Sequence, residues 1–208
     1  MSTILIIMQK LATIISYVFH PLLMAFYSIA ALFGLGTYIT GALPVQSQAI
    51  ILAFVFFITC AVPGAIIGFM IQFNVISNMD ITNYNERRIP YLVTATAYSF
   101  NYYLLHKFHL PSLLYYVLLG ATVTLLCAMV INLFWKISAH SIGIGGFTGL
   151  LVGLSLRMGL YIPLYLSIAF LLCGTIASAR LVLRVHTPAQ VYAGLALGFV
   201  VQFIITQL

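Results

Sequence analysis

Seven apolar runs follow one another along the chain, and each is long enough, or nearly so, to cross a bilayer. They lie at about 22–40, 48–73, 90–106, 111–132, 140–157, 161–182 and 188–207. Hydrophobic residues make up 63% of the chain and charged residues only 5%, which excludes a soluble globular domain. We therefore predict an all-α integral membrane protein, a bundle of about seven transmembrane helices.

The boundaries of the runs carry residues that start and end helices. Gly-Ala-Leu-Pro at 41–44 ends the first run, Pro111 and Pro188 open the fourth and seventh, and Pro163 lies at the start of the sixth. Residues 3–19, before His20-Pro21, are expected to form a helix that either lies at the membrane interface or extends the first span. The whole chain is predicted to be one membrane domain. In it, residues 1–75 hold this segment and the first two spans, and residues 76–208 hold the polar motifs.

The few charged residues exclude several kinds of partner. The formal net charge of +6 comes from scattered basic residues, which fits anionic lipid headgroups or an anionic substrate rather than nucleic acid. Asp80 and Glu86 are the only carboxylates and share one loop, so a weak divalent-cation site is conceivable there but a two-metal site is not expected. Cys60, Cys127 and Cys173 fall inside apolar runs and are expected to be packing residues. We expect no cofactor and no bound metal.

Polar residues outside the runs gather on one side of the expected bundle. The loops after the second, fourth and sixth spans share that side and contain residues 80–88, 136–140 and 180–190. The opposite side holds only His106, Lys107, His109 and Arg157, where we expect the two histidines to face lipid headgroups. Polar groups beside a bilayer are costly, so such a gathering indicates function. The sequence therefore predicts one site at the membrane surface, built from three loop–helix junctions.

The side chains in these loops suit the cleavage of a phosphate ester. Without a metal, this reaction needs cations for the phosphoryl oxygens, a nucleophile, an acid for the leaving oxygen and a group that orients the nucleophile. The candidate cations are Arg87, Arg88, Lys136 and Arg180. His186 or His140 can attack through a neutral ring nitrogen while the other acts as the acid. Ser138 can donate a hydrogen bond, and Gln190, four residues after His186, can accept from the other ring N–H.

Three short segments in these loops form an ordered set of motifs. They read Arg87-Arg88-Ile89-Pro90, then Ile137-Ser138-Ala139-His140, then Ala179-Arg180-x5-His186-x3-Gln190. The set resembles the type 2 phosphatidic acid phosphatase superfamily of membrane lipid-phosphate phosphatases. That family carries Lys-x6-Arg-Pro, Pro-Ser-Gly-His and Ser-Arg-x5-His-x3-Asp in the same order. The resemblance spans residues 80–190 and implies a six-helix catalytic core, so one of the expected spans is additional.

The resemblance also implies a role for each matched residue. His186 would be the nucleophile that forms a phosphohistidine, and His140 would protonate the leaving lipid alcohol. The phosphate would be bound by Arg88, Arg180 and Ser138. We add Lys136, one turn before His140, as a replacement for the lysine that the first motif lacks here.

The chain departs from the family pattern at several positions. Gln190 stands where the family has Asp, and an uncharged amide can hold a histidine ring but stabilises an imidazolium less. Glu86 of the first loop is an alternative partner. Two further residues have open alternatives. His20 either caps the helix at Pro21 or joins the site, and Arg184 either reaches to the interface or makes a second phosphate contact.

We therefore expect a metal-independent phosphatase acting on a membrane lipid phosphate, in a bacterial inner membrane. A transferase that uses the same phosphoenzyme, and a non-catalytic lipid-phosphate binder or transporter, are the alternatives. A prenyltransferase is disfavoured because Asp80 and Glu86 lie in one loop and the second acidic loop is missing. The polar face carries six Lys and Arg residues, Lys10 included, and the opposite face carries two, so the positive-inside rule would place the polar face in the cytoplasm. Most of the six are candidate substrate ligands, so orientation stays open, as do the oligomeric state and the particular lipid.

Overall fold

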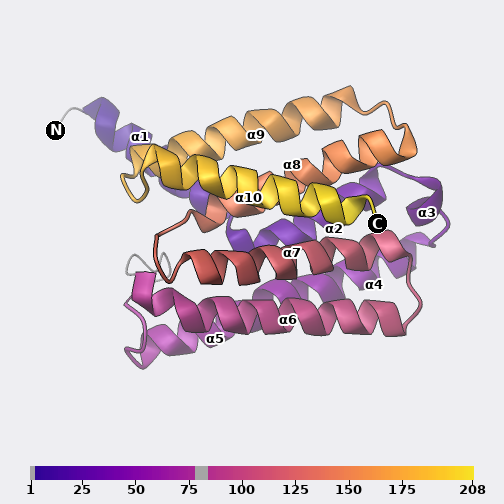
Figure 1. Ribbon diagram of the computed structural model, residues 1–208, viewed down its shortest axis with the longest axis horizontal. Helices are drawn as coiled ribbons and strands as arrows, with labels where there is room; N and C mark the ends of the chain where they lie inside the picture. The colour runs from indigo at the N-terminus through magenta and orange to yellow at the C-terminus, as the bar shows by residue number, and fades with distance from the viewer. Residues whose placement is uncertain (1–2, 78–83) are drawn as a thin grey trace. The chain divides into compact units, whose positions relative to one another are not determined.

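A computed structural model describes residues 3–77 and 84–208, so Asp80 lies outside the described residues. Within these ranges all regular secondary structure is helical (Figure 1). Six helical stretches there are long and apolar enough to cross a bilayer: Ile4–Gly34, Val45–Gln72, Ser112–Ile131, Ala139–Met158, Pro163–Val182 and Pro188–Thr206. This is the architecture of an all-helical integral membrane protein.

The expected spans and the observed helices differ at the N-terminal end. Helix α1 (Thr3–Val18) ends before His20, and Pro21 then begins a short 3₁₀ turn, η1 (Pro21–Leu23). Proline disfavours helical geometry in the residue before it, which explains this interruption. The apolar stretch Ile4–Gly34 therefore contains two helices rather than one.

The first expected span, 22–40, is wrong as a continuous helix. Helix α2 (Met24–Gly34) ends early and a separate short helix, α3 (Tyr38–Gly41), follows it. Gly36 between them has φ +57°, a left-handed conformation that ends a helix and that glycine adopts without strain. The third expected span, 90–106, forms helix α6 (Arg88–Lys107). This helix is 20 residues long, but its tyrosines and terminal cations make it more polar than the six stretches above.

The chain divides into two compact units, and unit 2 consists of residues Leu22–Trp135. Its remaining helices are α4 (Val45–Phe56), the π-helical turn η2 (Phe57–Ala61), α5 (Val62–Gln72), the 3₁₀ turn η3 (Tyr84–Arg87) and α7 (Ser112–Ile131). Helix α6 packs against α7, and α2 packs against α4 and α7. Pro63 lacks an N–H and would crowd the preceding turn of a regular α-helix, so the π turn accommodates it without ending the helix.

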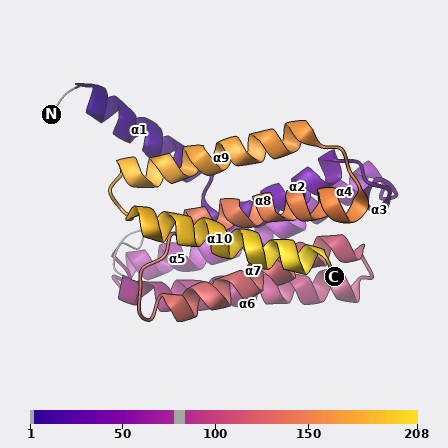
Figure 2. The same cartoon turned by 45° about the horizontal axis from the view of Figure 1, so that its top comes forward.

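Unit 1 consists of Met1–Pro21 and Lys136–Leu208. It contains α1, α8 (Ala139–Met158), α9 (Pro163–Val182) and α10 (Pro188–Thr206). Helix α8 packs against α10 and α9, and α1 packs against α9. Figures 1 and 2 show α10 alongside α8, and α1 beside the C-terminal part of α9.

Glycines bring α8 and α10 into close contact. A Cβ atom added at Gly149 would overlap the carbonyl oxygen of Phe199, and one added at Gly198 would overlap the carbonyl oxygen of Ile142. These neighbours are backbone atoms, which cannot move aside as a flexible side chain can. The close packing therefore fixes α8 and α10 against each other, in the manner of small-residue contacts in membrane helices.

Candidate functional site

The N-terminal ends of α8 and α10 meet in unit 1. The backbone N–H of Ser138, which precedes α8, donates to the carbonyl oxygen of Gln190 in the first turn of α10 at 3.3 Å. A Cβ at Gly194 would lie 2.8 Å from the Ser138 carbonyl oxygen, so a larger residue there would force the two ends apart. Lys136 Nζ donates to the carbonyl oxygen of Val185 at 2.9 Å. Two of the three polar loops expected to form the site are thus joined by hydrogen bonds.

His186 and Gln190 are connected through the N-terminal cap of α10. The Thr187 side chain accepts from the backbone N–H of Gln190, and Gln190 Oε1 accepts from the backbone N–H of Thr187 at 3.1 Å, forming a capping box. The same Oε1 lies 3.2 Å from His186 Nδ1. Because a backbone N–H can only donate, the atom facing it is the amide oxygen, and Nδ1 must therefore be the nitrogen that carries a hydrogen.

This geometry determines the tautomer of neutral His186. With the hydrogen on Nδ1, the lone pair is on Nε2, the nitrogen that a phosphohistidine would use. Gln190 therefore fixes the orientation of the His186 ring through its amide oxygen, although it brings no negative charge. Gln190 therefore has two structural roles: it holds the His186 ring and it caps α10.

His140 is the second residue of α8, and its side chain is held by α1. Its Nε2 lies 3.1 Å from the carbonyl oxygen of Ser16, which can only accept, so Nε2 carries a hydrogen. The ring of His20 packs edge-on against His140 with centroids 5.7 Å apart. The Arg180 guanidinium contacts Ser16 Oγ, so His20, His140 and Arg180 of unit 1 meet around Ser16. His186 lies within electrostatic reach of His140.

Arg180 lies in the last turn of α9 and is almost completely buried, with 2% of its surface exposed. Its Nη1 donates to Ser16 Oγ at 3.0 Å, so Ser16 contacts Arg180 through its hydroxyl and His140 through its carbonyl oxygen. The only Asp and Glu of the chain, Asp80 and Glu86, both belong to residues 22–135. A phosphate would therefore bring to unit 1 a negative charge that no Asp or Glu of that unit provides.

Ser138 is the N-cap of α8. Its Oγ accepts from the backbone N–H of Ser141 at 3.3 Å and from the Ser141 hydroxyl at 2.9 Å, and its side chain is buried. Capping is thus a structural role that the residue already fills. Phosphate binding by Ser138 stays a prediction.

The other predicted site residues lie in different surroundings. Arg184 is exposed just beyond α9, in a left-handed backbone conformation with φ +54°. Arg87, Arg88 and Glu86 belong to unit 2, where Arg87 is buried, Arg88 is exposed and Glu86 Oε2 accepts from the backbone N–H and the hydroxyl of Ser77. Their participation in the site stays a prediction. Over residues 3–77 and 84–208, no group of three or more His, Cys, Asp or Glu residues is arranged to hold a metal ion.

Two residues around His140 are hard to recognise from the sequence. No motif marks Ser16, because its contacts use a backbone carbonyl and an ordinary hydroxyl. The sequence leaves His20 between a cap and a site role, and in the structure its ring packs against that of His140. The Thr187-Pro-Ala-Gln190 pattern is a capping box that could have been recognised from the sequence alone.

Comparison with known proteins identifies no relative: no family model, no curated protein and no solved structure matches the chain.

Proposed function

We propose that the protein is a metal-independent lipid phosphate phosphatase that works through a phosphohistidine at His186, as the resemblance to type 2 phosphatidic acid phosphatases implies. One observation carries the proposal. His186, whose Nδ1–H is held by Gln190, lies within electrostatic reach of His140, and Ser16 joins His140 to a buried Arg180. A nucleophile, a second acid–base group and a fixed cation are the components that phosphoryl transfer requires.

In the first step, the lone pair on His186 Nε2 attacks phosphorus while Arg180 binds the phosphoryl oxygens. The N–P bond forms and the bond from phosphorus to the lipid oxygen breaks. Protonated His140 gives its Nδ1 hydrogen to that oxygen, because its Nε2–H is held by Ser16. In the second step, water attacks phosphorus, the N–P bond breaks and His140 takes a proton from the water. The products are the lipid alcohol and inorganic phosphate, and both histidines return to their starting states.

The composition and the location of the site favour a lipid substrate. His140 and His186 lie at or next to the N-terminal ends of α8 and α10, two of the helices that are apolar and long enough to span a bilayer. A site at the ends of spanning helices would be at the depth of lipid phosphate groups, which supports a lipid substrate. Phosphate binding by Ser138 and Lys136 of unit 1 is part of the proposal.

A phosphotransferase that passes the phosphate to a lipid or sugar hydroxyl is the second candidate. The observation in its favour is burial: His140 and His186 are only 7% and 8% exposed. Restricted access of water would slow hydrolysis of the phosphohistidine and leave it for another acceptor.

The decisive experiment measures phosphate release by the purified full-length protein in detergent, with EDTA present, across a panel of lipid phosphates. His186→Ala and His140→Ala are compared with His106→Ala, a histidine on the other side of the expected bundle. Release that survives EDTA, is lost in both site variants and persists in the control supports the phosphatase. Release that appears only after an alcohol acceptor is added supports the transferase. Binding of lipid phosphate without release or transfer refutes both.

A further inference from the structure

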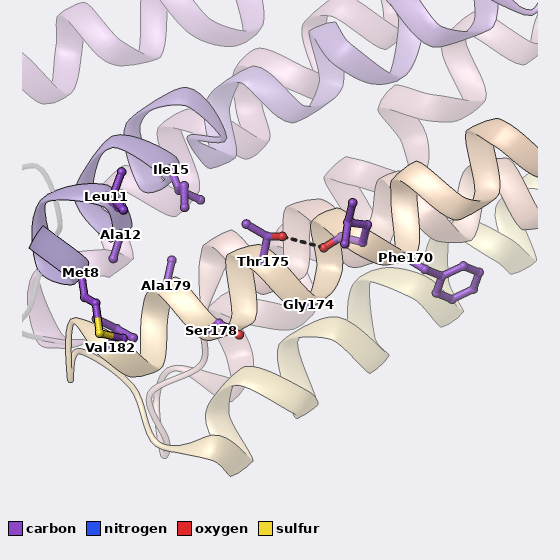
Figure 3. A pocket seen from close by; sticks show the side chains of 11 residues that line it. Met8, Leu11, Ala12, Ile15, Phe170, Gly174, Thr175, Ser178, Ala179 and Val182 are labelled. Carbon is purple, nitrogen blue, oxygen red and sulfur yellow. Dashed lines mark hydrogen bonds between the residues drawn. The ribbon is translucent and has the colours of Figure 1, made fainter. Parts of the chain in front are cut away.

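A groove lies between α1 and α9, entirely within unit 1 (Figure 3). Its apolar walls include Met8, Leu11 and Ile15 from α1 and Phe170, Leu171 and Val182 from α9. The volume is about 560 Å³, within the range of sites that bind small molecules. Figure 3 shows the lining side chains of α1, from Met8 to Ile15, beside those of α9, from Thr175 to Val182.

The floor of the groove is made of small side chains. A Cβ atom added at Gly174 would meet no neighbour within 4 Å, whereas one added at Gly149 in the α8–α10 contact would overlap backbone. Thr175 and Ser178 also line the groove, and the Thr175 hydroxyl donates to the carbonyl oxygen of Leu171 at 2.8 Å. Because that hydroxyl is used within α9, the groove offers mainly carbon atoms to whatever fills it.

One end of the groove lining adjoins residues of the candidate site. Ala12 and Ala179 form part of its lining, and each is next to a site residue. Ser16 Oγ lies 2.9 Å from the Ala12 carbonyl oxygen and 3.0 Å from Arg180 Nη1, and Arg180 follows Ala179 in the chain. Two lining residues of the apolar groove therefore adjoin the buried Arg180, Ala179 through the chain and Ala12 through the Ser16 hydroxyl.

We propose that this groove holds a hydrocarbon chain of the lipid whose phosphate reacts at His186. The inference rests on the proposed function for the position of the phosphate. An amphiphile with an anionic head and a long chain matches both parts: its charge complements Arg180, and its chain covers the exposed side chains of Met8, Leu11 and Phe170. A neutral lipid lacks the charge that complements Arg180, and a free sugar phosphate lacks a chain that fills the groove.

The first test compares alkyl phosphates with short and long chains as substrates of the full-length protein. Gly174→Phe fills the groove from a position where a Cβ has room, so the fold should tolerate it. Gly68→Phe is the matched control, because Gly68 is also an exposed helical glycine with no atom within 4 Å of its Cβ position. We expect Gly174→Phe to lower kcat/KM for the long-chain substrate roughly 10-fold or more relative to the short-chain one. Gly68→Phe should leave this ratio unchanged.

The outcomes separate the two proposals. An unaltered ratio in Gly174→Phe, with both substrates hydrolysed, overturns the groove and leaves the phosphatase intact. Hydrolysis of neither substrate counts against the phosphatase, and the groove is then tested by photolabelling. For this, a lipid phosphate with a photoreactive group in its chain and a diacylglycerol with the same chain are crosslinked to the protein. We expect the lipid phosphate to label residues 8–15 and 170–182 more strongly, and Gly174→Phe to abolish the difference. Equal labelling by the two probes would mean that bulk bilayer lipid fills the groove, and would refute the inference.

Discussion

Replacing Gln190 by alanine should separate the proposed catalytic role of this residue from its capping role. The side chain makes two contacts through one atom: Oε1 accepts from His186 Nδ1 at 3.2 Å and from the backbone N–H of Thr187 at 3.1 Å. Thr187→Ala is the matched control, because it removes the other half of the capping box and leaves the histidine contact in place.

Both variants should lose a similar amount of stability. Removal of a capping contact costs about 1 kcal/mol, so their unfolding temperatures in detergent should fall together. Only Gln190→Ala frees the His186 ring to turn and to place its hydrogen on Nε2, where it blocks attack on phosphorus. Loss of a contact that orients a functional histidine lowers activity roughly 10- to 100-fold, and we expect kcat to fall by this factor.

The assay is phosphate release from the best lipid phosphate substrate, measured beside thermal unfolding for each variant. Gln190→Glu is the complementary variant, since it keeps an oxygen acceptor for both contacts and adds a charge that stabilises an imidazolium. Its kcat should equal or exceed that of the original protein. Equal activity in Gln190→Ala and Thr187→Ala would show that Gln190 serves only as a cap, and would refute the assignment of the His186 tautomer.

Three other predictions address the packing, the cation and the chemistry. Gly198→Ala should lower the free energy of unfolding by about 1–3 kcal/mol, because its Cβ overlaps backbone of α8, whereas Gly68→Ala should have no such cost in the same thermal unfolding assay. Ser16→Ala should reduce kcat/KM for lipid phosphate about tenfold, because Arg180 loses the hydroxyl that orients it. The control Ser167→Ala, on α9, should not reduce it. Equal rates in the two variants would contradict the role of Ser16. Phosphate release should be the same with and without EDTA, and a loss that Mg²⁺ or Zn²⁺ restores would contradict histidine-only chemistry.

Most helix positions were predictable because apolar runs and prolines mark them. Pro163 and Pro188 begin α9 and α10 as their positions predicted, since proline is favoured in the first turn of a helix. The first span was wrong beyond Gly34, because its composition continues to be apolar although Gly36 takes a left-handed conformation. Hydrophobicity alone does not report such a turn.

The components of the candidate site were predictable in part. Side chains with reactive groups, such as His140, His186 and Arg180, are conspicuous in an apolar sequence. Ser16 was not conspicuous, because one of its two contacts uses a carbonyl that every residue possesses. The contact of Lys136 with the Val185 carbonyl oxygen is not predictable from the sequence for the same reason. Backbone acceptors become identifiable only when the folded chain brings them near a donor.

The most direct test of the central claim is detection of the phosphorylated intermediate. The purified protein is mixed with a lipid phosphate, quenched in alkali, under which phosphohistidine survives, and digested for mass spectrometry. We predict a phosphate on the peptide that contains His186, more of it in His140→Ala than in the original protein when an activated aryl phosphate is the donor, and none in His186→Ala. Release of phosphate from a protein that never carries the group at His186 would contradict the account.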